Sequence, residues 1–255
     1  MRKTAFTLVE VLVVITILSL LMAIMLPAMG KAREQGRRTL CMSNLRQMVL
    51  AAQTYTQTND EYYPVAHYRK KTDTAKFEYC WDFTTIQDRK TGEVKVVSGL
   101  LWQGQEVEKI QQCPSFKGDS NTKHDPYTGY NYNTSYIGHG EGESIETPAK
   151  VNQVRKPDKC ALFGDGQWRG GANKFMRAPL PWDGDKDNSL KAAGTQGYRH
   201  NKMTNVGWCD GHISSQKDFY TDTVKTEKQK IEQHNKTNDV KIGFLSPDNG
   251  AYDLD

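Results

Sequence analysis

The pattern of hydrophobic and polar positions changes once along the chain. Residues 6–29 contain 19 apolar residues among 24, and Glu10 is the only charged residue among them. The 21 residues that precede Pro27 would form a helix roughly 31 Å long, which matches the ~30 Å hydrocarbon core of a bilayer. The pattern predicts a membrane-spanning helix over residues 6–29.

A second pattern follows over residues 30–58, where apolar residues form one stripe. The stripe residues are spaced 4, 3, 4 and 3 apart, which places them on one helix face: Cys41, Leu45, Met48, Ala52 and Tyr55. Polar residues fall on the other faces: Arg37, Arg38, Asn44, Arg46 and Gln47. Pro27 and Gly36 are expected to kink or loosen the join, because proline removes a backbone donor. A helix from residue 6 to about residue 58 would span roughly 80 Å.

Short alternating runs replace the helical period after residue 58. They predict strands over residues 93–97, 130–137, 161–164 and 205–216, whereas the polar residues 224–234 fit either a helix or a loop. Within the last run, Asp210-Gly211 is the preferred pair for a tight type I′ hairpin turn. The predicted fold class is α+β, with a long N-terminal helix packed on an antiparallel β-rich head over residues 59–255.

Composition narrows the class of protein. Only 37% of the residues are hydrophobic and the net charge is +4, yet 24 of the 25 aromatic residues follow Met29. Aromatic side chains supply the buried area that aliphatic residues do not. We expect one ordered head on one anchor, which excludes a multi-pass transporter and an ordinary cytosolic enzyme.

Two general interpretations of the apolar segment fit it incompletely. A cleaved secretory signal would use the small residues near Ala28 and Gly30, but its apolar core would be ~7–15 residues long and would not contain Glu10. A plain signal anchor accounts for the length and leaves Glu10 without a partner in the bilayer.

Residues 3–10, with the sequence KTAFTLVE, are followed by the apolar run and then Pro27. This arrangement resembles the N-terminus of type IV pilins and type II secretion pseudopilins. The resemblance implies that a prepilin peptidase removes a leader of residues 1–5 by cutting between Ala5 and Phe6. The new amine of Phe6 would then be methylated. The family usually has glycine at the position of Ala5.

The resemblance also implies a location and partners. The mature chain would cross the inner membrane once, hold its head outside the cytoplasm, and pack residues 6–29 against identical or related subunits in a filament. Cleavage would create a cation at Phe6, four residues before Glu10. A buried carboxylate is costly unless it is paired, so a charge-assisted contact between Glu10 and the Phe6 amine of a neighbour would favour assembly.

The distribution of basic residues indicates the opposite orientation. Arg2 and Lys3 precede the apolar segment, whereas five basic residues follow it. A simple positive-inside count would place the head in the cytoplasm. The leader motif is the more specific signal, so the extracytoplasmic head remains the expectation.

A second resemblance lies near the C-terminus. His200, nine further residues and then Asp210-Gly211 resemble a structural signature of prepilin-like proteins from Planctomycetes, Verrucomicrobia and Lentisphaerae. Four further segments are similar to that group: Lys31-Ala32-Arg33, Asn44-Leu45-Arg46-Gln47, Cys113-Pro114-Ser115 and Tyr130-Asn131-Tyr132.

Two clusters have residue types that bind metals. Cys209 and His212 on the predicted hairpin, with His200, would form a poor zinc signature; we favour instead a hydrogen bond from His200 to the turn backbone. Asp183, Asp185 and Asp187 alternate as calcium ligands do, and are interpreted either as a calcium loop or as a solvated acidic turn. No other cofactor is expected.

Five cysteines leave at least one thiol outside any pairing within the chain, and Cys41 on the helix stripe is the expected buried free thiol. Three pairings of the other four remain open. Glycine-rich residues 138–142 and 164–166 are predicted turns. Basic residues 31–46, beside an apolar helix, are more typical of contact with lipid headgroups than of nucleic-acid binding.

The sequence therefore predicts a structural filament subunit that is not an enzyme. The alternative is a membrane-anchored extracytoplasmic enzyme or carbohydrate-binding domain that uses the N-terminus only for export. Exposed Trp168 and Trp182 beside Asp183 would favour carbohydrate binding, and a deep pocket with paired carboxylates would favour an enzyme.

Overall fold

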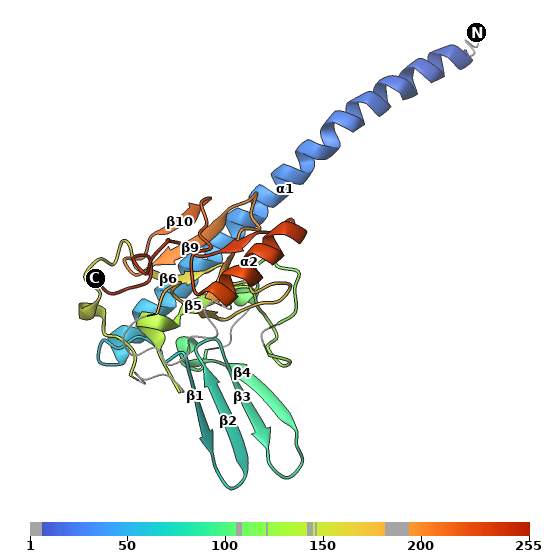
Figure 1. Cartoon of the computed structure of the whole chain (residues 1–255). Coiled ribbons are helices and arrows are strands. Elements are labelled where there is room, and N and C mark those ends of the chain that lie inside the picture. The colour runs from blue at the N-terminus through green and yellow to red at the C-terminus, as the bar shows by residue number, and fades with distance from the viewer. Residues whose placement is uncertain (1–6, 106–108, 121, 142–144, 146, 182–193) are drawn as a thin grey trace.

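The computed structural model describes residues 7–105, 109–120, 122–141, 145, 147–181 and 194–255. One helix, α1 (Leu8–Thr58), dominates the shape. Its N-terminal half projects from the molecule and its C-terminal half enters the head (Figure 1). The predicted combination of a long helix and an antiparallel β-rich head is confirmed.

The C-terminal half of α1 buries one face against the head. The buried residues recur at intervals of three and four, as helix geometry requires: Cys41, Asn44, Leu45, Met48, Val49, Ala52 and Thr56. Tyr55 is only half-buried, and Asn44, expected on another face, is buried. Asn44 can be buried because its amide donates to the Gln112 carbonyl at 3.3 Å and to the Tyr130 hydroxyl at 3.2 Å. The helix continues past Pro27 and Gly36 as one element.

A five-stranded sheet with the order β10-β9-β6-β5-β7 lies against α1. Its strands are β5 (Asn131–Asn133), β6 (Ala161–Gly164), β7 (Phe175–Met176), β9 (Thr204–Trp208) and β10 (Ile213–Gln216). β5 and β7 are parallel, and the other pairs are antiparallel. The predictions for residues 161–164 and 205–216 are confirmed.

Three aromatic side chains form the centre of the core beneath this sheet. The ring of Trp81 lies 5.3 Å from Phe163 and 5.7 Å from Tyr132, and the Tyr132 and Phe163 rings lie 5.1 Å apart. All three side chains are almost fully buried. Aromatic residues therefore supply the buried area that the aliphatic content of the head does not.

The strand predicted over residues 130–137 is wrong after Asn133. β5 ends there, and a single π-helical turn, η3 (Thr134–Gly138), follows. Asn133 causes the change, because its side-chain oxygen accepts from the Tyr136 amide while its side-chain nitrogen donates to the carbonyls of Ala161 and Tyr252. A side chain that bonds the local backbone competes with continuation of the strand.

An antiparallel meander projects from the head on the side away from the free end of α1 (Figure 1). Its strands are β1 (His67–Lys71), β2 (Ala75–Cys80), β3 (Phe83–Asp88) and β4 (Val94–Ser98). Only β4 matches a predicted strand. β1, with the sequence HYRKK, lacks the alternation that marks a half-buried strand, whereas residues 75–79 of β2 alternate between apolar and charged side chains and gave a strand signal that was missed.

Smaller elements complete the head. The 3₁₀ turns are η1 (Leu100–Trp102), η2 (Lys109–Gln111) and η4 (Val151–Gln153), and β8 (Gln196–Gly197) pairs with β11 (Ile242–Gly243). Between β10 and β11 lies α2 (Lys225–Thr237), so the ambiguous polar segment is a helix. Its three buried residues, Glu227, Ile231 and His234, follow helical spacing.

Candidate functional site

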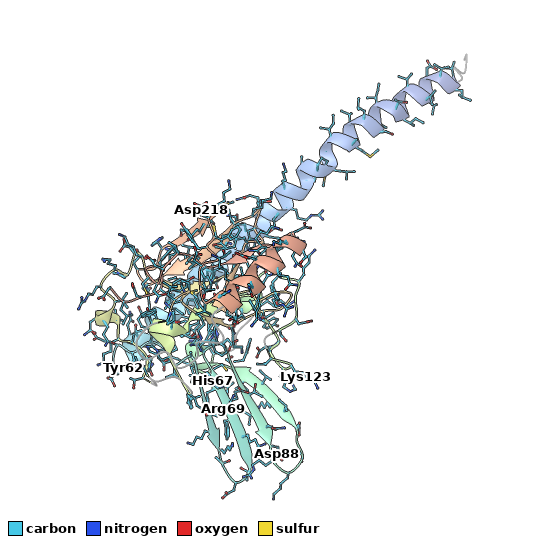
Figure 2. All side chains as sticks on the ribbon, viewed as in Figure 1. Tyr62, His67, Arg69, Asp88, Lys123 and Asp218 are labelled. Atoms are coloured by element: carbon cyan, nitrogen blue, oxygen red, sulfur yellow. The ribbon has the colours of Figure 1, made fainter. Side chains whose placement is uncertain are left out.

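The projecting half of α1 carries most of the exposed large hydrophobic residues of the described chain. Every large hydrophobic residue from Leu8 to Met29 is at least 48% exposed. Their side chains point outward around the whole circumference of the helix (Figure 2). This segment is long enough and apolar enough to cross a bilayer once. The geometry therefore fits a single-pass anchor with a C-terminal head.

Glu10 lies at the start of this surface and forms a capping box with Thr7. The Thr7 amide and hydroxyl both donate to Glu10 Oε2 at 2.8 Å, and the Glu10 amide donates to the Thr7 hydroxyl at 3.2 Å. The Thr-x-x-Glu spacing is a sequence signal for such a cap, which the analysis of the leader motif missed. Both bonds to the carboxylate fall on one of its two oxygens.

Several predicted site residues lie outside the described residues. They are the processing and methylation residues Ala5 and Phe6, the calcium candidates Asp183, Asp185 and Asp187, and Trp182. Trp168 is described and is half-buried against the core.

The signature residues Asp210 and Gly211 shape the β9–β10 hairpin. The predicted type I′ turn is wrong, since Gly211 has φ of +101° whereas Asp210 does not adopt a positive φ. The Trp208 backbone carbonyl instead accepts from the Gly211 amide at 3.0 Å, and the Trp208 backbone amide donates to the His212 carbonyl at 3.0 Å. These two bonds enclose a three-residue loop. A type I turn followed by glycine is the usual form of such loops. The Asp210 carboxylate accepts from the His212 amide at 3.0 Å.

His200 does not bond this turn, so the expectation for its side chain is wrong. It is fully buried, with Nδ1 2.9 Å from Glu34 Oε1 and Nε2 3.5 Å from both Asp165 Oδ2 and Cys113 Sγ. Nor does it join Cys209 and His212, because His212 pairs with Asp210 at 2.7 Å and stacks on Trp208.

The structure instead brings together four metal-ligating side chains from distant segments. The ligand atoms of Cys41, Cys113, Asp165 and His200 all lie within 4.8 Å of one another, and all four residues are buried. We refer to these four residues as the buried tetrad. All five cysteines are free thiols, including the predicted Cys41. Asp165 lies in the segment of residues 164–166 that was predicted only as a glycine-rich turn, and no short motif indicated that the other three residues meet.

Segments with resemblance to prepilin-like proteins surround the tetrad. Ser115, in the segment that contains Cys113, donates to Glu34 at 2.5 Å. Asn44 donates to Tyr130, and both belong to such segments. The resemblance of several separate segments to one protein group was the sequence signal for this site. Segments that share one signature can meet in space even when they are scattered along the chain.

Arg199 and His200 bring positive charge to the tetrad. Arg199 donates to Cys113 Sγ at 3.1 Å and pairs with Asp165 at 3.2 Å. Although burial opposes the shift, Cys41, Arg199 and His200 hold the pKa of Cys113 well below its usual range. Burial lowers the pKa of His200, but its hydrogen bonds to Asp165 and Cys113 outweigh burial and raise that pKa to about 10. Cys41, Arg199 and His200 therefore favour anionic sulfur at Cys113, against burial and the charge of Asp165.

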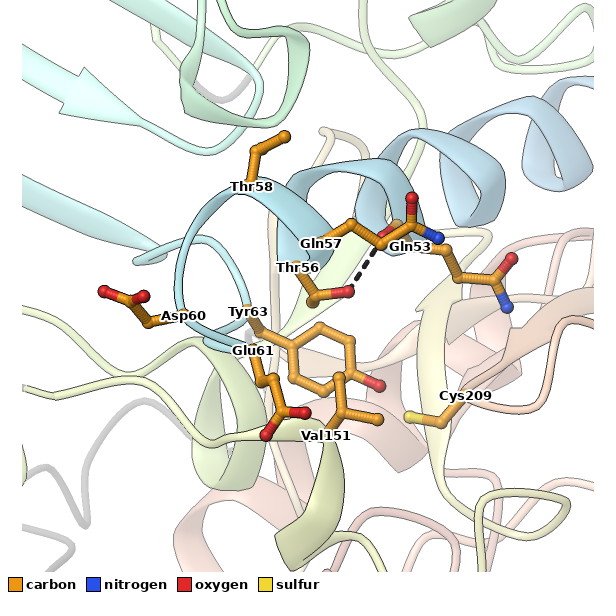
Figure 3. Close-up of a pocket in the computed structure, with 9 residues that line it drawn as sticks. All are labelled: Gln53, Thr56, Gln57, Thr58, Asp60, Glu61, Tyr63, Val151 and Cys209. Atoms are coloured by element: carbon orange, nitrogen blue, oxygen red, sulfur yellow. Dashed lines mark hydrogen bonds between the residues drawn. The ribbon is translucent and has the colours of Figure 1, made fainter.

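A hollow of about 590 Å³ lies where α1 ends. Tyr63 and Cys209 line it together with polar residues of the last helical turns (Figure 3). Its two carboxylates, on Asp60 and Glu61, point in different directions (Figure 3). Burial raises the pKa of the Tyr63 phenol. The nine residues that line this hollow therefore do not form the carboxylate pair that would have favoured the interpretation as an enzyme (Figure 3).

A membrane-length apolar helix that begins beside one carboxylate and continues into an α+β head is consistent with a pilin-like fold. Residues 1–26 match the family model described as the prokaryotic N-terminal methylation motif, and residues 30–153 match a protein of unknown function (DUF1559). Together these matches show a prepilin-type N-terminus and support a resemblance to the pilin-like proteins. Comparison with curated proteins and with solved structures gives no match.

Proposed function

We propose that the chain is a structural subunit of a filament of the type IV pilus or type II secretion pseudopilus kind. A prepilin peptidase removes residues 1–5, the Phe6 amine is methylated, and the projecting half of α1 packs against the same segment of other subunits. The observation that carries the proposal is the exposure of this apolar segment on all sides, with Glu10 at its start. The subunit's work is structural and includes no catalysis.

The proposed orientation places the head outside the cytoplasm, against the simple count of basic residues. Two of the residues that the count includes belong to the folded part of the molecule. Arg38 donates to Ser215 of the head at 3.0 Å, and Arg37 lies 3.5 Å from Glu34. Long folded domains translocate largely regardless of their charge, but both residues lie close enough to the membrane segment to count, so the proposed orientation rests on the leader motif.

The alternative, an anchored enzyme or carbohydrate-binding head, requires only export. It assigns no role to side-by-side contact between the apolar segments. Contact between these segments in assembled material therefore discriminates the two functions.

Cysteine cross-linking tests contact between the apolar segments of neighbouring subunits. All five natural thiols are buried, so a disulfide between chains is expected to form only through a newly introduced exposed thiol. Four single substitutions cover one helical turn: Ile15→Cys, Thr16→Cys, Ile17→Cys and Leu18→Cys. We expect at least one to give disulfide-linked dimers in a sheared filament fraction. The control Lys90→Cys, exposed on the meander, should remain monomeric. Monomers at all four helix positions would contradict the filament role.

A further inference from the structure

We propose that Cys41, Cys113, Asp165 and His200 form a structural zinc site that fixes α1 to the head. Two thiolates, an imidazole and a carboxylate are ligand types that zinc accepts in four-coordinate sites. The proposal stands apart from filament assembly, since the tetrad lies within the head.

The spacing of the ligand atoms fits a tetrahedral ion. Bonds of about 2.3 Å to sulfur and about 2.0–2.2 Å to nitrogen or oxygen place neighbouring ligand atoms roughly 3.3–3.8 Å apart. Cys113 Sγ and Asp165 Oδ2 each lie 3.5 Å from His200 Nε2, and Cys41 Sγ lies 3.1 Å from Asp165 Oδ1. The two Asp165 contacts are made by different oxygens, and one ligand atom from each of the four residues lies within 4.8 Å of the other three. Small side-chain movements therefore suffice to bring one Asp165 oxygen and the other three ligand atoms to a common ion.

The second nitrogen of His200 has the partner that metal-binding histidines usually have. Glu34 Oε1 lies 2.9 Å from Nδ1, on the side of the ring away from the tetrad. A carboxylate in this position fixes the ring and leaves Nε2 for the metal. Glu34 is in turn held by the Ser115 hydroxyl at 2.5 Å.

Hydrogen-bond donors also surround the other ligands. Asn205 donates its side-chain amide to Cys41 Sγ at 3.2 Å and its backbone amide to Asp165 Oδ2 at 2.7 Å. Arg199 donates to Cys113 Sγ at 3.1 Å. Donors of this kind orient metal ligands, and the charge of Arg199 offsets the third anionic ligand.

The four ligands come from four separate parts of the fold. Cys41 lies on α1, Asp165 directly follows β6, His200 lies between β8 and β9, and Cys113 follows η2. A zinc ion would tie the helix that leaves the membrane to three separate segments of the head. Structural zinc contributes folding free energy directly, because the unfolded chain has no preformed site.

Metal analysis of the full-length protein, purified in detergent and incubated with zinc before dialysis, tests the proposal. We expect about one zinc ion per chain, as a closed four-ligand site requires, and a sulfur-to-metal absorption band when cobalt replaces zinc. Cys113→Ser should lose the zinc and the band. Cys80→Ser, a matched change at another buried thiol, should retain both.

Glu34→Gln provides a variant that keeps every ligand, and it should weaken zinc binding by about 10–100-fold. A parent protein that stays free of metal, a cobalt form without the sulfur band, or an intact Cys41–Cys113 disulfide in the folded protein would each overturn the proposal. Unchanged zinc affinity in Cys113→Ser would do the same.

Discussion

Glu10→Gln is expected to reduce filament assembly by at least about tenfold while leaving processing intact. Glutamine retains the shape and the hydrogen-bonding capacity of a capping box, so the start of α1 survives the change. It removes the charge that would pair with the Phe6 amine of a neighbouring subunit. A hydrogen bond between charged groups contributes about 1.5–3 kcal/mol, so incorporation should fall by at least about tenfold. The measurement is the ratio of variant to total chain in sheared filaments and in membranes.

The structure makes Glu10→Gln more informative than Glu10→Ala, because alanine would remove the capping box and the charge together. Thr16→Ala is the matched control, since its hydroxyl only donates to the Leu12 carbonyl within the same helix. Its chains should enter filaments normally. Filaments of Glu10→Gln at the parental level would show that the charge of Glu10 has no part in assembly.

Lys174→Met should destabilise the head strongly. Lys174 is buried, and its ammonium lies 2.8 Å from Asp82 and 2.8 Å from Asp125. Methionine fills a similar volume but leaves both carboxylates without this cation. Breaking a buried ion pair costs about 3–5 kcal/mol, which corresponds to a fall in Tm of roughly 6–20 °C for a head of this size. Thermal unfolding followed by tryptophan fluorescence measures the fall in Tm. Trp81 is a suitable reporter because its indole donates to the Lys174 carbonyl at 3.0 Å.

Lys76→Met, at an exposed position on β2, is the control and should change stability by no more than about 0.5 kcal/mol. Equal Tm values for Lys174→Met and Lys76→Met would mean that the buried ion pairs do not hold the head together.

Local signals in the sequence predict the parts of the fold that depend on short stretches. The length of the apolar segment and the spacing of Cys41, Leu45, Met48 and Ala52 predict α1 and its buried face. Alternation and an Asp-Gly pair predict the β9–β10 hairpin, although the turn type depends on the loop length that the ladder imposes. Asn133 ends β5 through bonds to Ala161 and Tyr252, which local sequence does not contain.

The buried tetrad illustrates what a single sequence leaves open. Its members belong to four separate segments, and no short metal-binding motif links them. His200 and Asp210 belong to one signature, which favoured a shared site at the hairpin. The structure separates them: Asp210 shapes the turn, and His200 contacts Glu34 on α1. Glu34 and Cys41 lie seven residues apart on one face of α1. Only the packing of α1 on the head brings that face to His200 and Asp165.

The mass of the mature N-terminus tests the central claim most directly. Chains isolated from the native membrane, digested and analysed by mass spectrometry should yield an N-terminal peptide that begins at Phe6 and carries one methyl group on its amine. A chain that begins at Met1 would contradict processing by a prepilin peptidase. A chain that begins at Lys31 would show that the apolar segment is a discarded secretion signal, and a filament built on that segment would be ruled out.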